Sequence, residues 1–261
     1  SNRGGQLKEV LLKEFKTYDS LPVYLVKDWN ATFSLNFTTA QDKKLNTKDL
    51  YFEPTLSENN GSQVLSMKLK TSENTYLEYV YTLPKEGYML DLVVRSQGLA
   101  GAVNTSKPMN IDWKLQARRM EKSVTYENRY TQAAIQYEGD RINRMSQAGN
   151  DEQKEEKVSW VAYKQHLFTS VLISDSAFAN GDFLSYNIAN EESKDVKYTK
   201  NLKSTFPLKT KGGELSESLH FYFGPSDYNV LKQYNDKYEL TELIPLGWGI
   251  FGWLNKWLFI P

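Results

Sequence analysis

The sequence contains no cysteine and only two histidines among its 261 residues. The absence of cysteine excludes disulfide bonds, thiolate metal sites and cysteine nucleophiles, and two histidines are too few for a histidine-rich metal cluster. Net charge is also missing, because 32 basic and 32 acidic residues cancel. A neutral chain has no electrostatic footprint for a polyanion, so we expect no nucleic-acid partner.

Motifs of common active sites are missing as well. The chain has no G-x-x-x-x-G-K phosphate loop, no G-x-S-x-G elbow, no H-E-x-x-H motif and no EF-hand loop. His166 and His220 each stand alone in a strand-like run, and a general base also needs a partner and a cleft. Arg118, Arg119 and Arg129 are interleaved with acidic residues, which predicts a surface of mixed charge. We therefore expect no enzyme activity, no metal and no cofactor.

Apolar side chains recur at every second position through most of the chain. In residues 32–37 the apolar positions are Phe33, Leu35 and Phe37, and the same period is found at residues 65–69, 77–83, 90–94 and 111–117. Glycine, proline and asparagine between these runs favour tight reversals. The pattern predicts an all-β fold, a large antiparallel β-sandwich of about 12 to 18 strands.

Four segments depart from this alternation. Residues 8–15 predict a short helix, because apolar residues recur there with helical spacing. Residues 146–157 are polar without any apolar period, which predicts a solvated loop, and the Asn-Gly-Asp sequence at residues 180–182 predicts a turn. Beyond residue 223, Ser226 is a candidate N-cap, and the pattern predicts short C-terminal helices.

The last segment, residues 243–261, reads LIPLGWGIFGWLNKWLFIP, and Lys256 is its only charge. A helix over residues 247–260 would gather most large apolar side chains on one side, and its length of about 21 Å is too short for a hydrocarbon core of ~30 Å. Tryptophan suits the headgroup boundary, so we predict an amphipathic helix on the membrane surface. Its membrane-surface residues are Trp248, Ile250, Phe251, Trp253, Leu254, Trp257 and Leu258. The alternative is that this apolar face packs on the domain's own core.

Four segments carry a family resemblance. They read YTLPKEGYMLDLVV at residues 81–94, KVSWVAYKQHLFTSVLI at residues 157–173, FYFGPSDYNVLKQY at residues 221–234 and LGWGIFGWLNKWLFIP at residues 246–261. With these segments the chain resembles the large periplasmic domain of the YidC membrane protein insertases, in a bacterium similar to Bacteroides.

The resemblance implies a β-supersandwich between the first and second transmembrane helices of an inner-membrane protein, on the periplasmic side. It also implies that the last helix rests on the membrane surface and that insertion takes place in the transmembrane core. The implied partners are that core, the Sec translocon with its SecDF components, and nascent inner-membrane proteins. On this basis we divide the chain into an N-terminal lead-in (1–29), the β-supersandwich (30–223) and C-terminal helices (224–261).

The resulting hypothesis is a non-catalytic periplasmic domain that serves as scaffold and interaction surface for the insertion and folding of inner-membrane proteins, alone or with the Sec translocon. One alternative is a carbohydrate-binding or sugar-processing β-sandwich protein of the cell envelope, which predicts stacked aromatic residues beside paired carboxylates on a concave face. A further alternative is a lipid-anchored envelope protein unrelated to insertases.

Overall fold

The computed structural model describes residues 1–188 and 196–244, which contain fifteen β-strands and a few short helices. The strands are β1 (Val10–Lys16), β2 (Pro22–Val26), β3 (Ala31–Thr38), β4 (Lys44–Asn46), β5 (Glu53–Asn59), β6 (Ser62–Ser72), β7 (Thr75–Leu83), β8 (Met89–Gln97), β9 (Met109–Arg118), β10 (Gln132–Tyr137), β11 (Arg141–Arg144), β12 (Asp151–Lys164), β13 (Phe168–Asn187), β14 (Tyr198–Leu208) and β15 (Ser216–Pro225). The helical elements are η1 (Thr47–Asp49), α1 (Leu99–Ala102), α2 (Val124–Asn128), α3 (Tyr228–Lys232), α4 (Asn235–Tyr238) and η2 (Leu240–Leu243). The predicted all-β class and the short C-terminal helices are confirmed.

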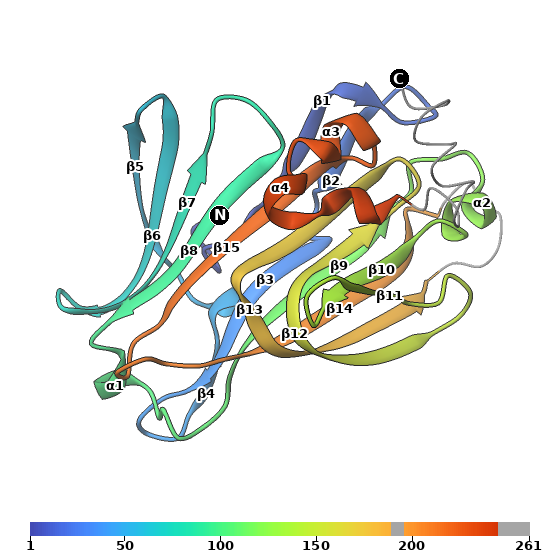
Figure 1. The fold of residues 1–261 in the computed structure, drawn as a ribbon. Helices are drawn as coiled ribbons and strands as arrows, with labels where there is room; N and C mark the ends of the chain where they lie inside the picture. The colour runs from blue at the N-terminus through green and yellow to red at the C-terminus, as the bar shows by residue number, and fades with distance from the viewer. Residues whose placement is uncertain (189–195, 245–261) are drawn as a thin grey trace.

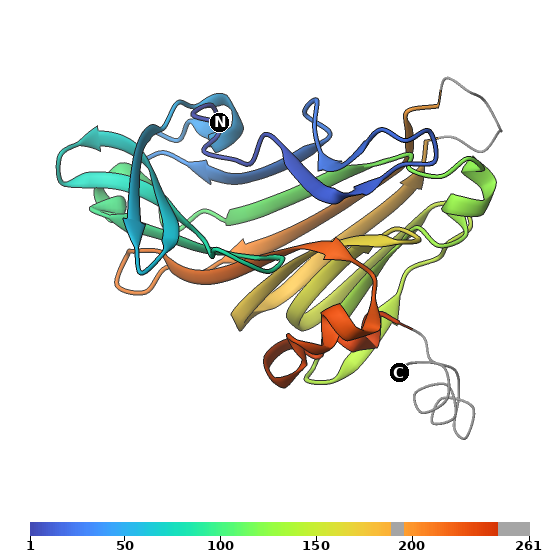
Figure 2. The ribbon, with the colours of Figure 1, turned by 90° about the horizontal axis from the view of Figure 1, so that it is seen from above.

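Thirteen strands form one antiparallel sheet that folds over itself into two layers (Figures 1 and 2). Its path runs β4-β3-β9-β14-β13-β15-β8-β7-β6-β5, and β12, β10 and β11 continue from the other edge of β13. β1 and β2 form a separate hairpin, whose Leu12, Val23 and Leu25 are buried in the main core. The large antiparallel sandwich is therefore built mostly from a single curled sheet.

β13 is the strand that carries the chain from one layer to the other. Its first part pairs with β15 up to Ser174, and its last part pairs with β14 from Asp182 onward. Between these parts, residues 174–177 stand opposite the single Ser159 of β12, and Ala177 has a positive φ of 54°. A bulge of this kind bends a strand and increases its twist, so one strand can belong to both layers.

Aromatic side chains dominate the core between the layers. The rings of Trp113 on β9 and Tyr163 on β12 stack with centroids 4.0 Å apart, and Phe33 meets Phe221 edge to face at 5.5 Å. The buried hydroxyl of Tyr163 donates to the carbonyl oxygen of Trp113 at 2.9 Å and lies 2.7 Å from the Ser204 hydroxyl. Because its polar end is hydrogen-bonded, this tyrosine can be buried without the cost of an unpaired hydroxyl.

The helix predicted for residues 8–15 is wrong, because this segment forms most of β1. β1 pairs with β2 across the turn at residues 17–21, and Leu12 is buried against the core. An isolated helix of eight residues is marginally stable in water. Pairing with β2 instead satisfies the backbone and buries one side of the hairpin, which a lone helix at this place could not do.

Two further predictions need correction. The loop predicted for residues 146–157 is confirmed for residues 146–150 and wrong for the rest, and the turn predicted at residues 180–182 is wrong. Residues 151–157 form the first half of β12, and residues 180–182 lie inside β13, its partner strand. Antiparallel pairing between β12 and β13 satisfies the backbone hydrogen-bonding groups of this polar segment, although the segment has no apolar period of its own. A Cβ added to Gly181 would lie 2.6 Å from the Phe183 ring and 2.9 Å from the Phe206 ring. The glycine therefore makes room for packed aromatic rings and does not mark a turn.

The first C-terminal helix begins one residue later than predicted. Asp227, and not Ser226, is the N-cap of α3, and its Oδ1 accepts a hydrogen bond from the Val230 N–H at 3.1 Å. The helical segment is also divided into α3, α4 and η2, with Glu239 at a positive φ of 53° between the last two. The proposed domain limits at residues 29 and 223 stay a prediction.

Candidate functional site

The predicted membrane-surface residues Trp248, Ile250, Phe251, Trp253, Leu254, Trp257 and Leu258 lie outside the described residues. The structure describes the elements that lead to them. α3, α4 and η2 pack on the face of the sheet formed by β10, β12, β13 and β15 (Figure 1). This C-terminal junction is the candidate site that the described residues define.

A second apolar cluster, separate from the main core, holds the C-terminal junction together. Leu231 of α3 and Leu240 and Leu243 of η2 are at most 1% exposed. They pack with Trp160 of β12 and Tyr222 of β15, which are fully buried. The indole Nε1–H of Trp160 also donates to the carbonyl oxygen of Tyr238 at 2.9 Å. The described chain therefore ends, at residue 244, in a fixed position on the sandwich.

A cluster of charged residues adds polar contacts to the same junction. His220 of β15 lies between two carboxylates, with its Nδ1 2.7 Å from Asp91 and its Nε2 3.1 Å from Asp175. Asp175 belongs to the bulge of β13 and also contacts the Lys237 ammonium group of α4 at 3.0 Å. Burial disfavours the charged imidazole, but the two carboxylates outweigh this effect and raise the pKa of His220 above its ordinary value.

Replacing Asp175 with asparagine is expected to lower the pKa of His220, because one of the two negative charges beside the ring is lost. The folded-state pKa is raised, so protonated His220 contributes stability below the ordinary value of 6.5, and this contribution is lost as pH rises through the folded-state pKa. NMR titration of the two histidine rings measures the change. Asp182→Asn removes a carboxylate from the same strand far from His220 and serves as control. An unchanged His220 titration in Asp175→Asn would contradict this role of Asp175.

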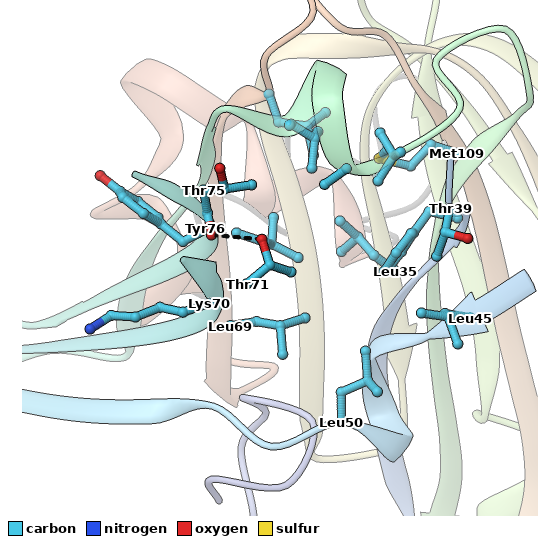
Figure 3. Close-up of a pocket in the computed structure, with 16 residues that line it drawn as sticks. Leu35, Thr39, Leu45, Leu50, Leu69, Lys70, Thr71, Thr75, Tyr76 and Met109 are labelled. Atoms are coloured by element: carbon cyan, nitrogen blue, oxygen red, sulfur yellow. Dashed lines mark hydrogen bonds between the residues drawn. The ribbon is translucent and has the colours of Figure 1, made fainter. Parts of the chain in front are cut away.

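An apolar cavity of about 240 Å³ lies at the other end of the sandwich, beside α1 (Figure 3). Its lining is mostly aliphatic and includes Leu35, Leu69 and Met109. Lys70 is the one charged residue of this lining, and its ammonium group points away from the leucines and pairs with Glu53 at 3.0 Å. Such a cavity can hold an apolar group. It lacks the paired carboxylates that the carbohydrate alternative predicts.

His166, the other histidine of the sequence, lies in the turn between β12 and β13. Its Nδ1 is 2.7 Å from a carboxylate oxygen of Glu121, and its ring contacts the rings of Tyr126 and Tyr130. The two histidines are therefore in separate clusters. Within residues 1–188 and 196–244, no group of three or more His, Asp or Glu side chains is placed to hold a metal ion.

Sequence reasoning missed Glu127, a buried acid of α2. Its side chain is 1% exposed, and its carboxylate accepts hydrogen bonds from the backbone N–H groups of Met120 and Glu121 and from the Gln165 amide. Burial raises the pKa of Glu127 to about 7, although these hydrogen bonds favour the charged form. Nothing in the local sequence distinguishes this glutamate from a surface residue.

Sequence reasoning also missed Lys200, a fully buried base of β14. Its ammonium group donates to the carbonyl oxygens of Thr131 at 2.8 Å and Gln147 at 3.0 Å, and burial lowers its pKa to about 8. A signal for its burial was present in the sequence. Lys200, Leu202 and Phe206 are separated by even numbers of residues along β14. Side chains two residues apart in a strand face the same layer, so the lysine is expected on the face of these apolar residues.

Comparison with known proteins adds a result at the level of sequence. The family profile described as the YidC periplasmic domain matches residues 1–261. The membrane protein insertase YidC of Porphyromonas gingivalis is 35% identical over 272 residues, which cover 100% of this chain and 42% of that protein. The YidC protein of Bacteroides fragilis is 32% identical over 265 residues, which cover 99% of this chain and 42% of that protein. The chain thus spans less than half the length of these relatives.

Comparison with solved structures finds weaker likeness. The galactosidase domain of alpha-galactosidase-sucrose kinase aligns with 77% of this chain and 31% of its own, with a TM-score of 0.41 and 10% sequence identity.

Proposed function

This chain belongs to the YidC periplasmic domain family, and from that premise we propose that it is the non-catalytic periplasmic domain of an inner-membrane insertase. In this proposal it is a scaffold and contact surface for the insertion and folding of inner-membrane proteins, alone or with the Sec translocon and SecDF. Its partners are the membrane surface, the transmembrane core of the same insertase and nascent inner-membrane proteins.

The observation that carries this proposal is that the short helices of the C-terminal junction are packed firmly on the sheet. The buried Trp160 and the Asp175–Lys237 pair hold the same short helices to the sheet through apolar and charged contacts. A segment that follows them starts from a fixed point on the sandwich. The sequence of residues 245–261 is rich in large apolar side chains, each of which contributes about 1.5–3 kcal/mol when it is fully transferred from water. Such a segment fits a membrane-surface helix that ties the scaffold to the bilayer.

The proposal assigns no covalent chemistry to this domain. His166 and His220 are paired with carboxylates, and Glu127 accepts hydrogen bonds from the backbone. Helix insertion needs a path along which apolar segments leave water, and it needs no covalent step. In the described part of the chain, none of the helices has the length and apolar character to cross a bilayer. In this proposal, insertion itself takes place in the transmembrane core.

Changing Trp253 and Trp257 together to serine tests the proposal. We expect the variant to associate about tenfold less with lipid vesicles in a flotation assay, because two interfacial anchors are lost. The control changes Tyr51 and Leu56, two exposed apolar residues of the described body, to serine. Equal vesicle association of the tryptophan variant and the original chain would count against the membrane-surface helix.

A further inference from the structure

The end of the sandwich that carries α2 combines exposed apolar side chains with basic residues, and we call it the basic end. It lies opposite the β5–β6 hairpin (Figure 2). Its exposed apolar side chains are Tyr18, Leu21, Tyr126 and Leu167. Its basic side chains are Lys27, Arg118, Arg119, Lys122, Arg129 and Lys197. They come from segments far apart in the sequence.

Contacts between these segments show that they form one continuous surface. The N–H of Tyr18, in the β1–β2 turn, donates to the carbonyl oxygen of Met120 at 3.1 Å, and the Arg119 guanidinium lies 5.4 Å from the Tyr18 ring. The Gln165 amide, in the β12–β13 turn, donates to the carbonyl oxygen of Arg118 at 2.7 Å. The two turns therefore meet at the end of β9.

The same surface extends to α2 and to the start of β14. The ring of Tyr126 in α2 contacts the ring of His166, which directly precedes Leu167. Arg118 and Lys197, at the ends of neighbouring strands, both contact the carboxylate of Asp28, at 3.2 and 2.9 Å. The basic end is thus a single face with aromatic, aliphatic and cationic side chains.

Exposed apolar side chains are concentrated at this end. Ten large apolar side chains are exposed in the described part of the chain. Four of them, Tyr18, Leu21, Tyr126 and Leu167, lie at the basic end. Two more lie on segments that contact it, since Trp29 follows Asp28 and Ile188 is hydrogen-bonded to Thr199 at the start of β14. Scattered exposed apolar residues are ordinary, but a concentration of them on one face marks an interaction site.

The described residues of this end carry a small excess of positive charge. In the described segments 17–21, 27–30, 118–130, 165–167 and 196–198 there are six basic and four acidic residues, whereas the whole sequence is neutral. One of the four acids, Glu127, is buried. A polar pocket of about 220 Å³ lies between the β1–β2 turn and the side chains of Arg118, Arg119 and Lys197. Asp19 also lines this pocket, so its three cations are opposed by one carboxylate, and the remaining excess of positive charge suits a phosphate headgroup.

We propose that the basic end is a second membrane-contact surface and rests on anionic lipid headgroups. This inference depends on the proposed function, which places residues 248–258 on the same membrane. The Ser226 N–H, directly before α3, donates to the carbonyl oxygen of Leu167 at 2.7 Å, so the helices that lead to that segment start from this surface. Tyrosine beside dispersed basic residues matches the headgroup region, where aromatic rings and cations are both favoured. The basic end and the C-terminal segment would then hold the sandwich at two points.

The test is cosedimentation of the full chain with two kinds of vesicle, phosphatidylcholine alone and phosphatidylcholine with phosphatidylglycerol. Changing the exposed Lys122 and Arg129 together to glutamate is expected to weaken binding to the anionic vesicles about tenfold and to leave binding to the neutral vesicles unchanged. The milder pair Lys122→Gln with Arg129→Gln changes the charge by half as much. Its loss of binding to the anionic vesicles should be about half that of the glutamate pair on a logarithmic scale. Leu21→Ser with Leu167→Ser is expected to weaken binding to both kinds of vesicle.

The matched control is Lys43→Glu with Lys44→Glu, which makes the same change of charge on exposed lysines at the opposite end. It is expected to bind like the original chain. The proposal is overturned if the basic-end variants lose no more anionic binding than this control, and the surface would then be assigned to a protein partner. Failure of the proposed function has a different signature, because Trp253→Ser with Trp257→Ser would then bind both kinds of vesicle like the original chain.

Discussion

Replacing Trp160 with alanine is expected to lower the unfolding free energy by about 3–5 kcal/mol, as measured by chemical denaturation of the full chain. The indole is fully buried in the cluster that joins β12 to α3 and η2, and its Nε1–H is hydrogen-bonded to the carbonyl oxygen of Tyr238. Its removal leaves a cavity beneath the C-terminal helices and an unpaired carbonyl group. The same variant is expected to weaken vesicle association, because the C-terminal segment loses its fixed starting point.

Two further variants separate packing from hydrogen bonding at this position. Trp160→Phe keeps most of the apolar volume and loses the hydrogen bond, so a smaller loss, about 1–2 kcal/mol, is expected. Trp29→Ala removes an indole that is 53% exposed and should change the unfolding free energy by less than about 0.5 kcal/mol. Equal losses in Trp160→Ala and Trp29→Ala would show that the C-terminal junction adds nothing to the stability of the sandwich.

In the original chain, Glu127 is expected to lower the unfolding free energy by about 3 kcal/mol as pH rises from about 4.5 to about 7, and replacing it with glutamine is expected to remove this decrease. The pKa of Glu127 is about 7 in the folded protein, against an ordinary value of 4.5. The folded state therefore keeps a proton that the unfolded state releases. The unfolding free energy must then fall as pH rises between these two values, by about 1.4 kcal/mol per pH unit. Glutamine does not titrate and removes this slope.

The measurement compares urea denaturation at about pH 5 and about pH 8 for the original chain and the variant. Glu58→Gln is the control, because Glu58 is an exposed carboxylate of the β5–β6 hairpin, at the opposite end of the sandwich from Glu127. It is expected to keep the slope. An undiminished slope in Glu127→Gln would mean that the buried carboxylate does not hold its proton. The residue also bears on the basic end, since its carboxylate holds the backbone of Met120 and Glu121 between Arg119 and Lys122.

The sequence by itself determined the fold class, most of the strands and the family. Strands such as β3 and β9 could be predicted because one face of each is buried. Apolar and polar residues therefore alternate along their sequences. The family could be recognised from the short segments around the C-terminal helices and from the composition of residues 246–261. These are local properties, which a reader of the sequence can see without knowing what each residue touches.

Only the tertiary structure decided the features that depend on distant partners. β1 is a strand because β2 pairs with it, and the polar half of β12 is a strand because β13 supplies its hydrogen bonds. Gly181 is explained by the rings of Phe183 and Phe206, and the burial of Glu127 by the segments that fold around it. The basic end likewise exists only because turns more than a hundred residues apart meet at the end of β9. Burial and pairing of a polar residue are set by what covers it, and residues far away in the sequence provide that cover.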